Sequence, residues 1–143
     1  MRQLAIPGAW VHTPTAHRDP CGTFHEISRA EAFSRATGRA LTLAQANVSV
    51  SRRGVLRGIH HVEVPPGQAK YVTCLQGAML DVAVDLRTGA PTYGGCERSG
   101  WTPRTGTRSI CQSNSGMPSS RSTTTHHGVL LFSGPCAGAG TWH

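Results

Sequence analysis

QANVSVSRRGVLRGIHHVEVPPGQAKYVTCLQGAMLDVAVDLRTG, residues 45–89, decides the fold because apolar and polar side chains alternate in residues 45–64 and again in 78–86. A period of two is the pattern of a β-strand with one buried side. Glycine-containing dipeptides divide the stretch into segments of strand length. We expect turns at Arg53-Gly54, Gln76-Gly77 and Thr88-Gly89.

The segment AMLDVAVDL, residues 78–86, has the clearest alternation. One face carries Leu80, Val82, Val84 and Leu86, and the other carries Met79, Asp81, Ala83 and Asp85. This predicts a strand with one buried side. The only plausible helix is RAEAFSRAT, residues 29–37, which Gly38 ends. Short strands separated by Gly and Pro turns predict an all-β sandwich or jelly roll.

The chain changes character near Gly94. In residues 95–143, 26 of 49 positions are Ser, Thr, Gly or Pro, and only five are Leu, Ile, Val or Phe. So few apolar side chains do not offset an ordering cost of about 1–2 kcal/mol per residue for the backbone. We expect one strand at GVLLF, residues 128–132, and an irregular or disordered chain elsewhere. The predicted division is 1–94 and 95–143.

The composition excludes several classes of protein. The net charge of +7 comes almost entirely from arginines that are scattered along the chain, so we expect no nucleic-acid partner. Five cysteines without a CxxC pair indicate free thiols in a reducing compartment. No run of about 18 apolar residues and no signal peptide are recognisable. We therefore expect a cytoplasmic protein without a membrane partner.

Residues 4–94 resemble the dTDP-4-dehydrorhamnose 3,5-epimerase family. The resemblance rests on IPGAWVHTPTAHRDPCGTFHE and on GVLRGIH followed by PPGQAKYV. It implies a cupin-type jelly roll (a double-stranded β-helix), of which this chain holds the N-terminal part. It also implies a homodimer, no metal and no organic cofactor. The implied reaction is epimerisation of a dTDP-4-keto-6-deoxy sugar at C3, C5 or both.

The resemblance assigns the reacting groups to His60 and Lys70. A ketone acidifies the protons on the neighbouring carbons, so epimerisation needs a base, an enolate stabiliser and an acid on the opposite face. His60 matches the base, since an imidazole accepts a proton near neutral pH. Lys70, the only lysine, matches the group that stabilises the enolate oxygen.

Four further residues match substrate-binding positions of the family: Arg57, Gln45, Asn47 and Glu26. The planar guanidinium of Arg57 suits a phosphate or sugar contact. In a regular strand Arg57 and His60 face opposite ways, so a bend at Gly58 is needed to bring them together. One position departs from the family: Cys21 stands where the family has a substrate-contacting arginine.

The family's tyrosine acid, and the aspartate that orients the basic histidine, lie beyond the resemblance. Codons compatible with RSICQSNSGMPSSRSTT, residues 108–124, give VYLSEQLGHAFLALDD when they are read one base earlier. That run resembles the next strand pair of the family and contains a tyrosine. We hypothesise that a frameshift near Gly94 or Gly95 replaced the second half, which leaves the printed chain inactive and prone to aggregation.

Two alternatives remain at this point. Clustered His60, His61 and Glu63 are also the residue types of a metal-binding cupin, although adjacent histidines on a strand face opposite ways. The other alternative is a sugar-nucleotide-binding remnant without catalysis.

Overall fold

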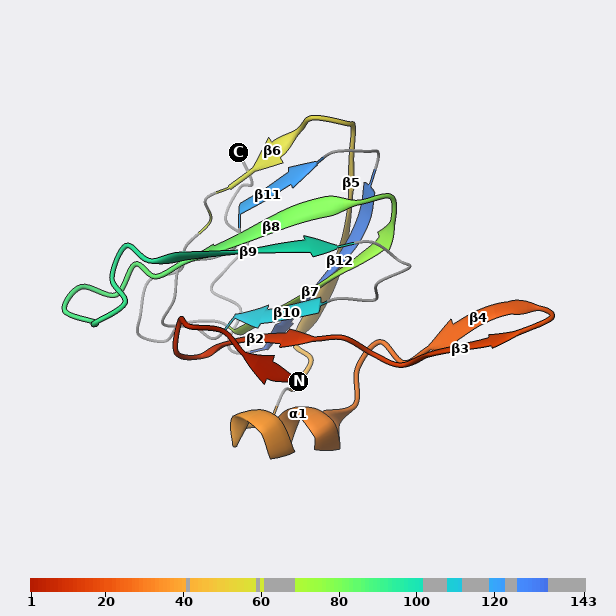
Figure 1. Cartoon of the computed structure of the whole chain (residues 1–143), viewed down its shortest axis with the longest axis horizontal. Coiled ribbons are helices and arrows are strands. Elements are labelled where there is room, and N and C mark those ends of the chain that lie inside the picture. Colours follow the sequence, from red (N-terminus) through yellow and green to blue (C-terminus); the bar gives the residue numbers. More distant parts are fainter. Residues whose placement is uncertain are drawn as a thin grey trace.

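The protein is described from a computed structural model. It describes residues 1–40, 42–58, 60 and 69–101, together with the backbone of three later strands. Two antiparallel sheets face each other, and a helix, α1 (Ala30–Thr37), lies beneath one of them (Figure 1). The strands are β1 (Arg2–Gln3), β2 (Ala9–His12), β3 (Ala16–Asp19), β4 (Gly22–His25), β5 (Gln45–Ser51), β6 (Leu56–Arg57), β7 (Ala69–Gln76), β8 (Met79–Val84), β9 (Cys96–Trp101), β10 (Arg108–Cys111), β11 (Ser119–Ser122) and β12 (His126–Ser133).

The strands form two large sheets and a separate hairpin. The six-stranded sheet has the order β1-β2-β10-β7-β12-β5, and the four-stranded sheet has the order β6-β11-β8-β9. Strands β3 and β4 pair only with each other within the described residues, and they project to one side of the molecule (Figure 1). We call this hairpin the arm. The predicted all-β sandwich is confirmed.

Apolar side chains fill the space between the two sheets. Leu4, Ile6, Ala9 and Val11 from the β1–β2 region pack with Ala83 of β8. A second cluster joins Val72 and Cys74 of β7 to Met79 of β8. These contacts identify the inner faces: the even-numbered residues of β7 face the odd-numbered residues of β8.

The predicted alternation of β8 is present, but the more buried side is the one with the two aspartates. Met79, Asp81, Ala83 and Asp85 are at most 7% exposed, whereas Leu80, Val82 and Val84 are half-buried. Apolar periodicity did not indicate this, because a buried carboxylate is tolerated when hydrogen-bond donors surround it.

Asp85 is the clearest case of such a buried carboxylate. It is 0% exposed, and it accepts hydrogen bonds from Arg87 Nε at 2.8 Å, from Arg87 Nη2 at 2.6 Å and from the Thr92 hydroxyl. Its backbone pairs with Gly94 and Gly95 across the loop. The pKa of Asp85 lies well below its ordinary value, chiefly because Arg87 donates to it. This carboxylate therefore holds the β8–β9 loop together.

The helix and the turns follow the sequence closely. The predicted helix is α1, and Gly38 ends it in a left-handed conformation, with φ 70°. Phe33 of α1 packs on Tyr71 and Trp10 on the outer face of the six-stranded sheet. The predicted turn glycines, Gly54, Gly77 and Gly89, have φ between 81° and 82°, a region that side chains other than glycine disfavour.

Residues after Gly94 contain more strands than the composition indicates. The expected strand at residues 128–132 lies within β12, but β9, β10 and β11 also form. Strand β10 lies between β2 and β7, and β12 lies between β7 and β5. Backbone groups make these pairings, and they need little from the side chains. The other residues of 102–143 lie outside the described part.

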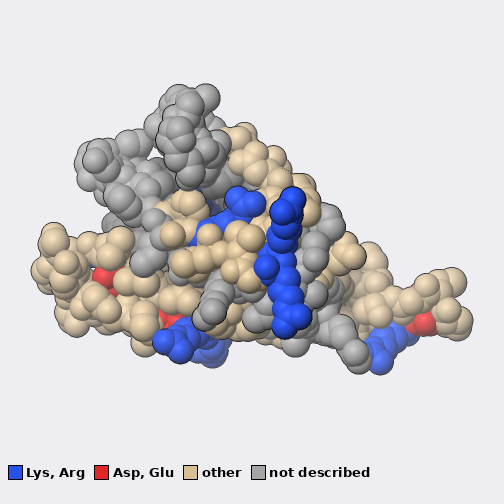
Figure 2. All heavy atoms as spheres, turned by 90° about the horizontal axis from the view of Figure 1, so that it is seen from above, with Lys and Arg blue, Asp and Glu red and all other residues tan. Residues whose placement is uncertain are grey.

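Three further features bear on the sequence predictions. Cys21, Cys74 and Cys96 are free thiols. On the face shown in Figure 2, Lys and Arg side chains form separate groups rather than one continuous basic surface. Within the described residues, no helix has the length and apolar character required to span a membrane. A cytoplasmic location stays a prediction.

Substitution of Asp85 tests the importance of the buried carboxylate. We expect Asp85→Asn to lower the free energy of unfolding by about 2 kcal/mol, the scale of a lost hydrogen bond to a charged group. Urea denaturation measures the change, and Glu31→Gln on the exposed first turn of α1 is the control. Because the folded pKa of Asp85 is depressed, its stabilisation is present above about pH 4 and is lost on acidification. Equal stability of both variants would contradict this role.

Candidate active site

The register of the six-stranded sheet brings three of the expected site residues to one face. Gln45 and Lys70 both pair with position 132 of β12, which lies between their strands. In the same way, Asn47 and Val72 both pair with position 130. Directly paired residues of antiparallel strands point to the same side of a sheet. Val72 belongs to the core between the sheets. Gln45, Asn47 and Lys70 therefore face the inside of the sandwich.

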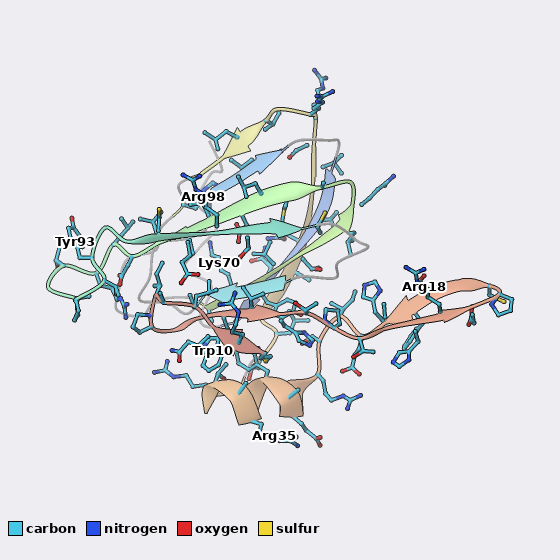
Figure 3. The ribbon with its side chains drawn as sticks, viewed as in Figure 1. Trp10, Arg18, Arg35, Lys70, Tyr93 and Arg98 are labelled. Atoms are coloured by element: carbon cyan, nitrogen blue, oxygen red, sulfur yellow. The ribbon has the colours of Figure 1, made fainter. Side chains whose placement is uncertain are left out.

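Lys70 is buried between the two sheets. It is 3% exposed, and in Figure 3 it lies between β9 and β10. Its neighbour Tyr71 points the other way and packs against Phe33 of α1, as alternation along a strand requires. Lysines are almost never fully buried without a polar partner, so the fold has to supply polar surroundings for the ammonium group.

A bend at Gly58 separates Arg57 from His60. Strand β6 ends at Arg57, and Gly58 has φ 124°. This left-handed conformation favours glycine and stops the alternation of a regular strand before His60 is reached. The bend expected from the sequence is present, so Arg57 and His60 are not required to face opposite ways.

Burial and two cations lower the pKa of His60. Burial has the largest effect, followed by the positive charge of Lys70 and then by that of Arg57. Both cations therefore lie near enough to repel the protonated ring. A lowered pKa keeps the imidazole neutral at pH 7, which is the form that accepts a proton.

Arg57 is held by the preceding strand. Its Nε donates to the Ser51 hydroxyl at 2.7 Å, and its Nη2 donates to the Val50 carbonyl at 3.3 Å. Ser51 is buried, whereas Arg57 is exposed. The guanidinium therefore stands at the rim of the sandwich with one edge fixed by the protein.

Gln45 and Asn47 form a polar pair on β5. Gln45 Nε2 donates to Asn47 Oδ1 at 3.0 Å, which fixes both amides relative to each other. Side-chain amides both donate and accept hydrogen bonds, and this suits the hydroxyl groups of a sugar. Their inward side and their position in the sheet agree with the predicted binding role.

Glu26 lies away from the other expected site residues. It forms an ion pair with Arg29, at 2.5 Å between Oε2 and Nη2. The next residue, Ile27, accepts a hydrogen bond from the Tyr71 hydroxyl through its carbonyl. Because Tyr71 and Lys70 point to opposite sides of β7, Glu26 lies on the helix side of the sheet. Within one chain the structure does not bring it to Lys70.

The surroundings of His60 do not favour a metal cation. His61 and Glu63 lie outside the described residues, and among the described ones no group of three His, Cys, Asp or Glu side chains lies together. The charges that act on His60 are those of Lys70 and Arg57. Two positive side chains repel a divalent ion and attract an anion instead.

Sequence reasoning missed Ser51. Its hydroxyl contacts Arg57, and it lies on the same face of β5 as Gln45 and Asn47. The signal was present in the sequence, because positions 45, 47, 49 and 51 are all polar while 46, 48 and 50 are apolar. A polar stripe on the inward side of a strand indicates a lined site rather than a packed core.

A family model described as dTDP-4-dehydrorhamnose 3,5-epimerase matches residues 3–101. A dTDP-4-dehydrorhamnose 3-epimerase from Streptomyces niveus is 60% identical over 94 residues, which are 66% of this chain and 45% of the relative. The chain thus spans about half the length of the curated relatives it matches.

Two solved structures have a similar fold over nearly the whole chain. NovW, a 4-keto-6-deoxy sugar epimerase from the novobiocin gene cluster of Streptomyces spheroides, has a TM-score of 0.90 and 44% identity. The likeness covers 96% of this chain and 69% of NovW. ChmJ, a 3'-monoepimerase from Streptomyces bikiniensis solved with dTDP-quinovose, has a TM-score of 0.89 and 43% identity. The likeness covers 95% of this chain and 69% of ChmJ. The cupin-type jelly roll is confirmed.

The repulsion between Lys70 and His60 is open to direct measurement. We expect Lys70→Met to raise the pKa of His60 toward its ordinary value, because a neighbouring positive charge is removed. Arg57→Gln should raise it less, since Arg57 is the smaller of the two charge effects. NMR titration of the histidine ring protons measures both, with the His60 signal assigned by its loss in His60→Asn.

Arg35→Gln on the exposed side of α1 is the control and should leave the titration unchanged.

The lowered pKa of His60 also determines how pH affects the stability of the fold through this site. The unfolded chain takes up a proton near pH 6.5 before the folded one does, so this site destabilises the fold as the pH falls below that value. A titration of His60 that Lys70→Met does not move would contradict the arrangement.

Proposed function

Because the chain belongs to the dTDP-4-dehydrorhamnose 3,5-epimerase family, we propose that its site is built to epimerise a dTDP-4-keto-6-deoxy sugar at C3, C5 or both. The observation that carries the proposal is the buried ammonium of Lys70, whose charge, together with burial, lowers the pKa of His60. Relatives that act on such sugars, among them NovW, support a role in deoxysugar or antibiotic biosynthesis.

The two groups divide the first half of the reaction between them. A ring nitrogen of His60 takes the proton from the carbon beside the ketone, and the electron pair of the broken C–H bond moves into an enolate. The negative charge on the ketone oxygen is stabilised by the Lys70 ammonium, a contribution of about 2.7–4 kcal/mol for one such donor. Return of a proton from the opposite face by an acid completes the inversion.

The proposed binding of substrate follows the charges and amides around this pair. Arg57 at the rim is the candidate contact for the diphosphate, and Gln45 and Asn47 are candidates for the sugar hydroxyls. Cys21, exposed in the arm, supplies no charge where the family has an arginine. We therefore expect weaker binding of the nucleotide portion than in relatives with that arginine.

We propose that the protein is a homodimer, as the resemblance implies. Strand β5 is an edge of the six-stranded sheet, and its outward side exposes Val48 by 63% and Val50 by 55%. An edge strand offers unpaired backbone groups to a second chain. The arm, with Phe24 69% exposed, also lacks a covering layer in the described residues. If Glu26 contacts substrate, it must do so in the site of the second copy.

A change of reading frame after residue 94 explains how the two parts of the chain differ. The match to the Streptomyces niveus relative spans 94 residues, whereas the likeness to NovW covers 96% of the chain. We infer that the gene encodes a second half of the family's type, with its tyrosine acid, in the alternative frame. The printed chain then has a base and an enolate stabiliser but no acid.

Resequencing of the gene tests this inference first. We expect one inserted or missing base near codon 94, and we expect the corrected protein to exchange solvent deuterium into a dTDP-4-keto-6-deoxy sugar. The printed chain should be inactive and prone to aggregation. An intact frame, or exchange catalysed by the printed chain, would refute the frame hypothesis.

In the corrected protein, His60→Asn should reduce deuterium exchange about 10²–10⁴-fold, the usual contribution of a general base. The matched control is His12→Asn. His12 follows Val11, which faces the core, so its side chain points to the other side of β2. Undiminished exchange by His60→Asn would exclude His60 as the base.

The dimer is tested by removing the apolar surface of β5. We expect Val48→Glu together with Val50→Glu to give a monomer in analytical ultracentrifugation, because two charges oppose burial of that surface. Tyr93→Glu, at a similarly exposed apolar position on the β8–β9 loop, is the control and should remain a dimer. A monomeric unsubstituted protein would refute the proposal outright.

A further inference from the structure

The contact between Ser51 and Arg57 joins the two sheets at the rim of the site. Ser51 ends β5 in the six-stranded sheet, and Arg57 ends β6 in the four-stranded sheet. The intervening turn is closed by Val55 N–H donating to the Arg52 carbonyl at 3.3 Å. Ser51 Oγ then accepts from Arg57 Nε at 2.7 Å. An inward-facing side chain of one sheet thereby fixes the charged group of the other.

We propose that Ser51 is a positioning residue, which holds the guanidinium of Arg57 in the orientation that receives the diphosphate of a nucleotide sugar. This inference rests on the proposed function and deepens it. Nε and Nη2 form one edge of the guanidinium, and Ser51 and Val50 occupy that edge. The end of the guanidinium, where Nη1 and Nη2 each carry a further N–H, is left for bidentate contact with phosphate oxygens, and Arg57 is exposed.

Holding the side chain before the ligand arrives is the physical advantage. An arginine at an exposed strand end loses up to about 2 kcal/mol of rotamer freedom when it is fixed. Two hydrogen bonds to β5 impose much of this loss during folding, so less remains to oppose binding. The Ser51 hydroxyl is suited to this task because it is 8% exposed on a strand that is itself paired with β12.

The same contact keeps a positive charge near His60. Arg57 is one of the groups that lower the pKa of His60. If the guanidinium were released into solvent, water and salt would screen its effect on the ring. Loss of the Ser51 hydroxyl therefore has two measurable consequences, one on binding and one on the titration of His60. If Ser51 had only a packing role, its replacement would alter neither binding nor the His60 titration through Arg57.

The experiment compares variants of Ser51 by calorimetry with dTDP-glucose and by NMR titration of His60. We expect Ser51→Ala to weaken binding about 10-fold, the size of one lost hydrogen bond to a charged group, and to raise the pKa of His60. Ser51→Thr keeps the hydroxyl and should restore both. Ser34→Ala, at a half-buried serine of α1 that lies outside this stripe, is the matched control and should change neither.

A double-mutant cycle separates positioning from general destabilisation. In an Arg57→Gln background, Ser51→Ala should have no further effect on binding or on the titration, because the group it positions is absent. Equal binding and an unchanged His60 pKa in Ser51→Ala would overturn the inference, as would additive losses in the cycle. If the unsubstituted protein does not bind dTDP-glucose, the proposed function fails, and the His60 titration in Ser51→Ala still decides whether Ser51 holds Arg57.

Discussion

Burial of the Lys70 ammonium between two β-sheets is the constraint on which the site depends. Removing an ammonium group from water costs several kcal/mol unless polar groups surround it. The chain has one lysine and places it inward on β7, on the same face of the sheet as Gln45 and Asn47 of β5. Repulsion from this charge, added to burial, keeps His60 neutral. Lys70 thus helps to set the electrostatic state of His60.

Local patterns in the sequence were enough to predict α1 and the strands between residues 45 and 84, but not β1–β4. Alternation indicated β5 and β8, and glycines marked the turns because they adopt positive φ. Alternation did not reveal which side of β8 is buried, since that depends on donors such as Arg87 and Thr92 on the loop after it. Strands β9, β10 and β11 were also missed, and β10 and β11 pair with strands that lie far away in the sequence.

The site was predictable in part for the same reasons. The family resemblance singled out Lys70 and the β5 amides, the pairing of their strands places them on one face, and the bend after Arg57 follows from Gly58. The Ser51–Arg57 contact joins strands of different sheets, so no pattern within one strand indicates it. Glu26, which pairs with Arg29, lies on the helix side of the sheet, and no pattern within one strand indicated that either. Local patterns in the sequence therefore indicated several of the elements but not the contacts between them.

The interleaved order of the six-stranded sheet has a consequence for biosynthesis. Strand β2 and strand β7 are joined only through β10, and β7 and β5 only through β12. Both bridging strands emerge from the ribosome after every strand they connect. Non-local pairing of this kind folds slowly and leaves strand edges open in the meantime. The sheet therefore closes only after the strands at its centre have been synthesised, and a chain cut short before β10 would lack the centre of the sheet rather than its margin.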